Sequence, residues 1–155
     1  MKTAHESENM IFSVDNTNVY AAAGVHSASW RESHRSFCAP DFIARHTPER
    51  QREYIGKKMR SGSRFYMLVD GGPVGIVSVT GDLIEDLYVL PEKQGMGYGT
   101  ELLRFAVEKC RGIPTLWILE NNVKAAGFYR RKGFRETGRI KAVADGINEI
   151  EFKLE

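Results

Sequence analysis

Long apolar stretches are missing from this 155-residue sequence. The longest stretch without Asp, Glu, Lys or Arg runs from Asn16 to Trp30, which is shorter than the about 20 residues that a bilayer-spanning helix needs. The first residues, Met1 to Asn9, are polar and lack the apolar core of a signal peptide. The sequence therefore predicts no membrane segment and a cytoplasmic location.

Cysteine, histidine and excess charge are also scarce. The two cysteines, Cys38 and Cys110, form no Cys-x-x-Cys motif and are expected to be free thiols in a reducing compartment. The four histidines show no metal-ligand spacing, so no metal site is predicted. The net charge of +2 is too small to indicate a nucleic-acid-binding surface.

What the sequence does contain is the composition of an ordinary globular domain. Apolar residues make up 42% and charged residues 27% of the chain, which is close to the average for folded proteins. A chain of this length can bury about two-thirds of the surface that it exposes when unfolded. We therefore expect one domain over residues 1–155.

Apolar spacing and capping residues predict the elements of the N-terminal part. Met10–Val14 reads as a strand, and a helix capped by Asn16 or Asn18 should run through Trp30. The segment 31–47 looks irregular. Thr47 followed by Pro48 and an acidic residue is a good helix start, and this helix should run to about Arg60.

Alternating apolar residues and glycine turns dominate the rest of the chain. Strands are predicted at Phe65–Val69, Val74–Thr80, Leu83–Leu90, Thr115–Leu119, Phe134–Arg139 and Ile147–Leu154, and helices at Gly97–Arg111 and Asn122–Lys132, with Gly112 and Gly133 as their C-terminal stops. The resulting order, β-α-α-β-β-β-α-β-α-β-β, indicates an α/β domain with a mixed sheet.

Three alternate glycines, Gly95, Gly97 and Gly99, lie directly between a predicted strand and a predicted helix. Such a turn can direct several backbone N–H groups at one anion, and the helix N-terminus adds partial positive charge. A diphosphate fits this arrangement, although the same loop could simply connect the strand to the helix. The sequence has no Gly-Lys-Ser/Thr of a P-loop, and neither glycine pair continues to the third glycine of a dinucleotide fingerprint.

The run Gln94-Gly95-Met96-Gly97-Tyr98-Gly99 is similar to the Q/R-x-x-G-x-G/A motif of the GNAT-type N-acetyltransferases. The run Asn122 to Tyr129, followed by Gly133-Phe134, resembles the N-x-x-A-x-x-F-Y-x-x-x-G-F signature of the same family. The resemblance covers the chain from about Phe65 to the C-terminus. It implies a GNAT-like three-layer fold: a mixed, mostly antiparallel sheet that splays open between two parallel strands and carries helices on both faces.

The resemblance also implies acetyl-CoA as co-substrate, with no metal. Backbone amides of the glycine loop would hold the pyrophosphate. The strand before the loop would pair with the pantetheine arm, in the opening beside Thr115–Leu119. The residues expected to bind the cofactor are Leu87, Tyr88, Val89, Gln94, Gly95, Met96, Gly97, Tyr98, Gly99, Thr100, Asn122, Ala125, Phe128 and Tyr129.

Acetyl transfer to an amine needs a proton donor for the departing thiolate and a route for the amine proton. Tyr129 stands where the family has its general acid, although it could instead be a core aromatic residue. The family's usual oxyanion donor is a backbone N–H near Val89. Glu85, placed by strand alternation on the same face as Leu87 and Val89, is a candidate base. Glu120 is a second candidate, and either acid could instead be a surface or ion-paired residue.

Asp86, expected on the opposite strand face, ranks third as a base.

The acceptor should bind among the N-terminal helices and their joining loop. The candidate residues there are Trp30, Arg31, Glu32, His34 and Phe37.

The resemblance as a whole implies an N-acetyltransferase. It would move an acetyl group from acetyl-CoA to a primary amine of a small molecule or peptide by direct attack on the thioester. A non-catalytic CoA- or acyl-CoA-binding module on the same fold stays open, as does an interaction domain whose loop binds incidental phosphate. A homodimer is possible, and no nucleic-acid or membrane partner is predicted.

Overall fold

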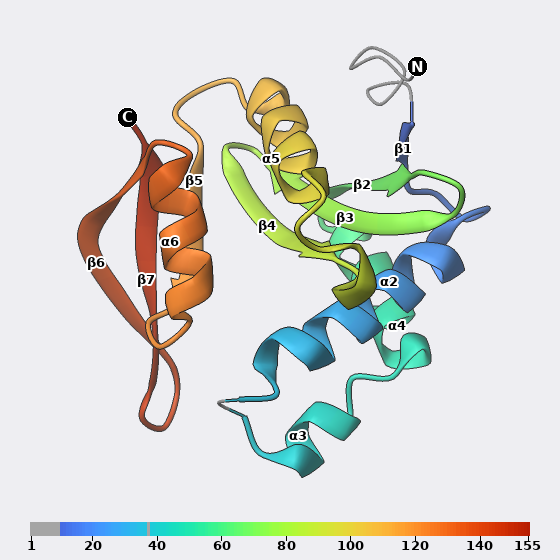
Figure 1. The fold of residues 1–155 in the computed structure, drawn as a ribbon, viewed down its shortest axis with the longest axis horizontal. Helices are drawn as coiled ribbons and strands as arrows, with labels where there is room; N and C mark the ends of the chain where they lie inside the picture. Colours follow the sequence, from blue (N-terminus) through green and yellow to red (C-terminus); the bar gives the residue numbers. More distant parts are fainter. Residues whose placement is uncertain (1–9, 37) are drawn as a thin grey trace.

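The computed structural model describes residues 10–36 and 38–155, which form a seven-stranded sheet with helices packed against it (Figure 1). The strands are β1 (Ile11–Ser13), β2 (Arg64–Val69), β3 (Pro73–Thr80), β4 (Leu83–Val89), β5 (Thr115–Leu119), β6 (Phe134–Ala144) and β7 (Ile147–Leu154). The helices are α2 (Val19–His34), α3 (Pro40–Ala44), α4 (Pro48–Arg60), α5 (Tyr98–Lys109), α6 (Val123–Arg131) and the 3-10 turn η1 (Pro91–Lys93).

The strands lie in the order β1-β2-β3-β4-β5-β7-β6. Every neighbouring pair is antiparallel except β4 and β5, which are parallel. This mixed, mostly antiparallel sheet confirms the predicted fold class. The glycine loop joins β4 to α5, so it lies at the end of one of the two parallel strands.

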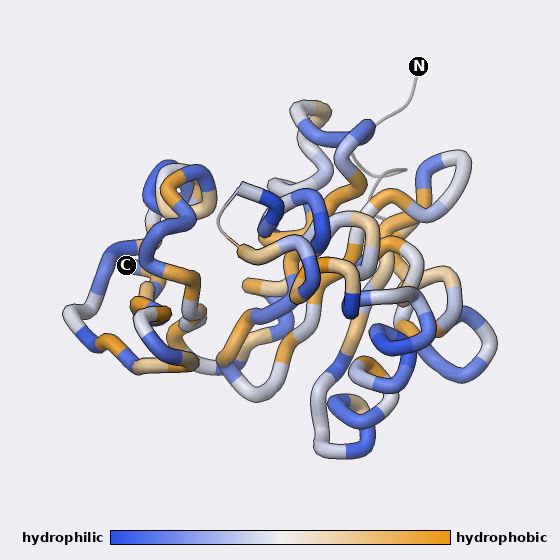
Figure 2. Tube along the Cα trace, turned by 90° about the horizontal axis from the view of Figure 1, so that it is seen from below, coloured by the Kyte–Doolittle hydropathy of each residue, from blue (hydrophilic) through white to orange (hydrophobic). Residues whose placement is uncertain are grey.

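Two apolar cores lie on opposite faces of the sheet. Leu102 and Phe152 belong to the core under α5 and α6, and Ile55 belongs to the core that α2 and α4 cover. Neighbouring residues of β3 alternate between them: Ile76 lies in the second core and Val77 in the first, and both are fully buried. Figure 2 shows apolar residues concentrated along the central strands and hydrophilic residues along the outer turns of the helices.

Capping residues act as the sequence predicts at several helix ends. The Oγ1 atom of Thr47 accepts a hydrogen bond from the N–H of Arg50 at 3.2 Å, and Pro48 opens α4. Gly133 follows α6 with a φ of +95°, which only glycine adopts readily. In the described part of the chain, no helix is long and apolar enough to cross a membrane.

Several expectations about the helices and strands were wrong. Helix α2 continues past Trp30 to His34, and the segment expected to be irregular contains α3, which begins at Pro40. Strand β6 continues to Ala144. Helix α5 ends at Lys109, and Gly112 is not its C-terminal glycine: its N–H bonds to the carboxylate of Asp82, which leaves no space for a Cβ.

Candidate active site

A gap in strand pairing opens between β4 and β5. The two parallel strands pair at Leu83 and Thr115 only, and Figure 1 shows them diverging from there. The N–H of Leu90 bonds to the carbonyl of Val74 on β3. Because alternate residues of a strand direct their N–H and C=O groups to opposite edges, those of Val89 point toward the β5 side. The end of β4 therefore offers backbone donors and acceptors to an extended ligand.

A β-bulge at Asp86 changes the face of the sheet on which the later side chains of β4 lie. Two residues of β4 lie opposite Val77, because Ser78 pairs with Glu85 and Ile76 pairs with Tyr88. Asp86 has a φ of +54°, and it is the single non-glycine residue in the described chain with a positive φ.

The bulge overturns the face assignment made from strand alternation. Glu85 lies on the α4 side, where its Oε1 is 2.6 Å from Nζ of Lys58, whereas Leu87 and Val89 pack against the core under α5 and α6. Asp86 is not on the opposite face from Glu85, because its carboxylate also reaches residues of α2 and α4. Strand alternation failed here because the bulge adds one residue to the strand.

The glycine loop forms the N-terminus of α5. Gly95 and Gly97 have φ values of +77° and +90°, and Gly97 is the N-cap residue. Among the described residues, no hydrogen bond is donated by the backbone N–H groups of residues 95–100, which include Met96 and Thr100. Free N–H groups at a helix N-terminus form an anion site, so this geometry suits a diphosphate.

Helix α6 lies beside this loop. Asn122 caps α6 by accepting a hydrogen bond from the N–H of Ala125 at 3.2 Å. A Cβ on Gly99 would lie 3.6 Å from the ring of Phe128, so the Phe128 side chain of α6 packs close to the first turn of α5. The side chain of Gln94 spans the same region: its amide donates to the carbonyl of Val89 at 3.2 Å and accepts from Lys124 at 3.1 Å.

Tyr129 is a buried residue of α6. Its ring makes edge-to-face contacts with Phe128 and Phe134, at centroid distances of 5.2 and 5.8 Å. Burial raises the pKa of the Tyr129 hydroxyl far above its usual value, so the group stays protonated at neutral pH. The electrostatic influence of Tyr129 also raises the pKa of Tyr88 on β4, after the larger effects of burial and of Asp86.

The carboxylates expected to act as a base have different surroundings. Glu85 is held by Lys58. Glu120 is exposed at the end of β5, where the side-chain amide of Asn148 donates to it at 3.1 Å. Burial on its own raises the pKa of Asp86. The hydrogen bond and charge of His26, the charge of Lys58 and the hydrogen bond from Ser78 together outweigh this effect, so the pKa of Asp86 lies below its usual value.

The expected acceptor residues divide between two faces of α2. The ring of Trp30 is stacked between His34 and His46, at centroid distances of 3.9 and 3.5 Å, so both faces of the indole are covered. Phe37 lies outside the described residues.

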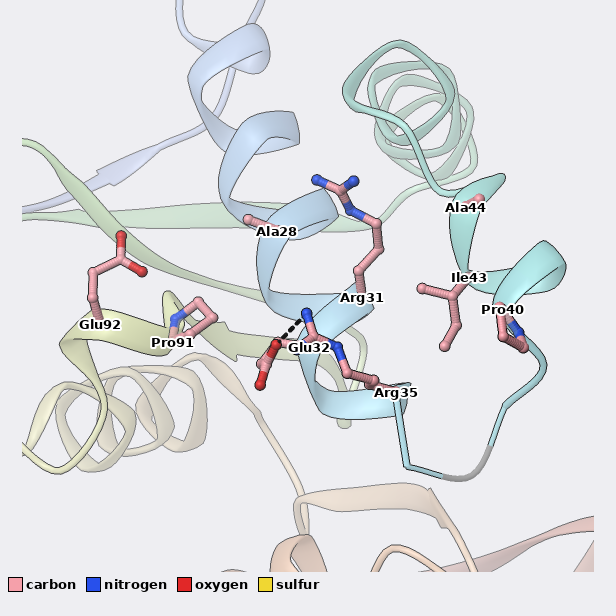
Figure 3. Close-up of a pocket in the computed structure, with 9 residues that line it drawn as sticks. All are labelled: Ala28, Arg31, Glu32, Arg35, Pro40, Ile43, Ala44, Pro91 and Glu92. Atoms are coloured by element: carbon pink, nitrogen blue, oxygen red, sulfur yellow. Dashed lines mark ion pairs between the residues drawn. The ribbon is translucent and has the colours of Figure 1, made fainter.

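Arg31 and Glu32 line a cavity of about 550 Å³ between α2, α3 and η1 (Figure 3). Its other lining residues are Ala28, Arg35, Pro40, Ile43, Ala44, Pro91 and Glu92. The cavity reaches η1, which leads directly into the glycine loop.

The contribution of His26 and Tyr54 was not predicted from the sequence. His26 on α2 is 3.1 Å from Asp86, and the hydroxyl of Tyr54 on α4 donates to the same carboxylate at 3.1 Å. The available signal was the polar pair Glu85-Asp86 inside an otherwise apolar strand.

Comparison with known proteins agrees with this geometry. The GNAT acetyltransferase domain family matches residues 61–136. A probable N-acetyltransferase of Mycobacterium tuberculosis is 30% identical over 129 residues, covering 76% of this chain and 74% of that protein. The peptidyl-lysine N-acetyltransferase YjaB of Salmonella typhimurium is 37% identical over 67 residues, covering 43% of this chain and 46% of YjaB, so the chain matches only about half of that relative's length.

The fold is shared with solved structures as well. The PaiA N-acetyltransferase of Thermoplasma acidophilum, solved in complex with coenzyme A, superposes with a TM-score of 0.66 over 92% of this chain and 97% of that one, at 16% sequence identity. The motifs, the sheet with its single divergent parallel pair, and the relative matched over three-quarters of the chain lead to one conclusion. This chain belongs to the GNAT family of acetyltransferases.

Proposed function

We propose that this chain is an N-acetyltransferase that moves the acetyl group of acetyl-CoA to a primary amine of a small molecule or peptide, by direct attack on the thioester. The observation that supports this most directly is the glycine loop. Its unpaired N–H groups at residues 95–100 lie beside the open edge of β4. A diphosphate would bind to the loop, and an extended amide-bearing arm would lie along Leu87, Tyr88 and Val89. When bound, acetyl-CoA supplies an activated acyl thioester.

Helix α6 would form the other wall of this site. Phe128 packs near Gly99, and Asn122 and Ala125 lie at the N-terminal end of α6. The carbonyl of Val89 accepts from Gln94, but a carbonyl oxygen has a second lone pair that an amide of the arm could use. The chain therefore offers both polar and apolar contacts to a cofactor of this shape.

Two groups of this chain would serve the chemical step. The N–H of Val89, directed toward the opening, would stabilise negative charge on the thioester oxygen. Tyr129 would protonate the departing thiolate. Burial raises the pKa of Tyr129 and so weakens it as an acid. The same burial would raise the pKa of the thiol, which keeps proton transfer feasible.

The amine must lose a proton before it attacks. Glu85 and Glu120 are the proposed acceptors of that proton, directly or through water. Glu85 would have to act while paired with Lys58. Glu120 is exposed and accepts a hydrogen bond from one amide, that of Asn148. Substituting each by Gln, with kcat measured against pH, separates the two candidates.

The proposal is tested by calorimetric titration with CoA, followed by an acceptor screen that measures free thiol released from acetyl-CoA. The screen includes peptides with an internal lysine, because the Salmonella relative is named as a peptidyl-lysine N-acetyltransferase. We expect CoA binding and at least one productive amine. Binding without transfer to any amine would favour the non-catalytic module, and no CoA binding would contradict the proposal. A cytoplasmic location and a homodimer stay predictions.

A further inference from the structure

A cluster of buried polar side chains surrounds the carboxylate of Asp86 on the face of the sheet that α2 and α4 cover. His26 is 2% exposed and Ser78 is fully buried. The Nε2 atom of His26 lies 3.1 Å from Oδ1 of Asp86, and Oγ of Ser78 donates to Oδ2 at 2.9 Å. Tyr54 donates to the same carboxylate, and Gln51 contacts the other ring nitrogen of His26. Residues from α2, α4 and β3 therefore converge on one residue of β4.

The backbone of Asp86 needs this support. A φ of +54° is uncommon for an L-residue, although Asp and Asn adopt it more readily than others, and it is favoured where the surroundings hold the residue in place. Three donors fix the carboxylate in one orientation: His26, Tyr54 and Ser78. None of them belongs to the glycine loop or to α6, but the cluster borders the proposed cofactor contacts on β4: the ring of His26 makes an edge-to-face contact with Tyr88 at a centroid distance of 5.2 Å.

The bulge determines what the end of β4 presents. It places Leu87 and Val89 on the α5 side and Tyr88 on the α2 side. Removing the extra residue from the pairing would move each of these side chains to the other face, because a one-residue slip reverses every side chain of a strand. A regular β4 could also continue its parallel pairing with β5 beyond Leu83 and Thr115, which would close the opening.

We propose that His26 and Asp86 are positioning residues for acetyl-CoA: by holding the bulge in β4 they keep the edge at Leu87 and Val89 open, although neither side chain belongs to the proposed cofactor contacts. This inference rests on the proposed function for its ligand. Its structural part, an open edge maintained by a buried pair, can be measured on the protein without any ligand.

The test uses two pairs of variants of the full chain. His26→Gln keeps a donor near the position of Nε2, and Asp86→Asn keeps an acceptor and tolerates a positive φ. His26→Leu and Asp86→Leu remove these properties. We expect each Leu variant to weaken CoA binding at least about tenfold, which corresponds to about 1.4 kcal/mol. The Gln and Asn variants should stay within about threefold of the wild type. Equal affinity of folded His26→Leu and the wild type would overturn the inference.

A matched control tests whether loss of a buried, hydrogen-bonded carboxylate is enough to change affinity. Glu151 on β7 is 4% exposed and accepts from Thr137 and Arg139. Glu151→Leu should lower the thermal midpoint while leaving CoA affinity unchanged. If Glu151→Leu weakens CoA binding as much as His26→Leu does, the effect is general destabilisation and the inference fails.

Amide hydrogen exchange provides the ligand-free measurement. In the wild type, the N–H of Val89 faces the opening and should exchange rapidly, whereas in His26→Leu it should slow at least about tenfold as β4 pairs with β5. Unchanged exchange at Val89 in the folded variant would overturn the inference. Failure of the proposed function would look different: the wild type itself would bind no CoA, while the effect on Val89 exchange would still be seen. If Asp86→Leu does not fold, the His26 pair decides the outcome.

Discussion

The hydroxyl of Tyr98 donates a hydrogen bond to Oδ2 of Asp70 at 2.6 Å. Tyr98 is the first residue of α5, and Asp70 lies in the turn between β2 and β3. The hydrogen bond therefore connects the glycine loop to the β2–β3 hairpin, which lies on the side of β4 away from β5. It also raises the pKa of the Tyr98 hydroxyl, because Asp70 accepts this hydrogen bond from the protonated hydroxyl and carries a negative charge.

Tyr98→Phe removes this hydrogen bond and keeps the ring. We expect CoA affinity to fall about threefold to tenfold, because the first turn of α5 loses one anchor while water screens part of the interaction. Calorimetric titration with CoA measures the change. Tyr20→Phe, at a 63% exposed position on α2, is the control and should bind CoA as the wild type does. Wild-type affinity in Tyr98→Phe would show that the loop holds its shape without Asp70.

Gly97→Val tests the glycine loop itself. The φ of Gly97 is +90°, and a Cβ there would meet no atom within 4 Å, so the substitution strains the backbone without creating a clash. CoA affinity should fall more than about tenfold, because the N–H groups of the loop can no longer converge on one anion.

Gly138 on β6 is the matched control for Gly97→Val. It has a φ of +91° and also has no atom within 4 Å of a Cβ. Gly138→Val should destabilise the protein by a similar amount and leave CoA affinity unchanged. Equal affinities of Gly97→Val and the wild type would mean that the loop is only a connector.

Local signals in the sequence predicted most of the fold. Strand β7 begins and ends at the predicted residues, and the Thr47 cap forms the predicted hydrogen bond. Both features depend on residues close together in the chain. Helix α3 was missed because it has five residues and buries none of them, so neither length nor apolar spacing identifies it.

The candidate site was less predictable where contacts are distant in sequence. Gly112 lies against Asp82, and β4 and α5 separate the two residues in the sequence. The packing role of Gly112 therefore has no local signal. The environment of Asp86 depends on His26 and Tyr54, which belong to two separate helices. Strand alternation predicts the faces of β4 correctly only in the absence of a bulge, and the polar pair Glu85-Asp86 was the one available warning.

Stability should depend on pH through the two histidines stacked on Trp30. Burial lowers the pKa of both His34 and His46; a hydrogen bond to a backbone carbonyl opposes this in part, and the charges of neighbouring groups lower the pKa further. The unfolded chain therefore binds protons below about pH 6.5 while the folded chain does not, so the free energy of unfolding falls as pH decreases from that value. Urea unfolding at pH 7.5 and 5.5 measures the difference. His46→Gln should reduce this difference in the free energy of unfolding. An unchanged difference in this variant would assign the pH dependence to other groups.

Tyr129→Phe tests the proposed general acid. The substitution keeps the ring and its contacts with Phe128 and Phe134 and removes only the hydroxyl. General acid catalysis contributes about 10²–10⁴ in rate, so kcat should fall at least about tenfold while CoA affinity changes no more than about threefold. The loss should be smaller for an acyl donor whose thiol leaves as a weaker base, because that donor needs the proton less.

Tyr66→Phe is the control for Tyr129→Phe, since Tyr66 is also buried in this core and packs edge-to-face against Phe105. Full activity in Tyr129→Phe would show that Tyr129 is a packing residue and that water, or the ammonium proton of the acceptor, protonates the thiolate.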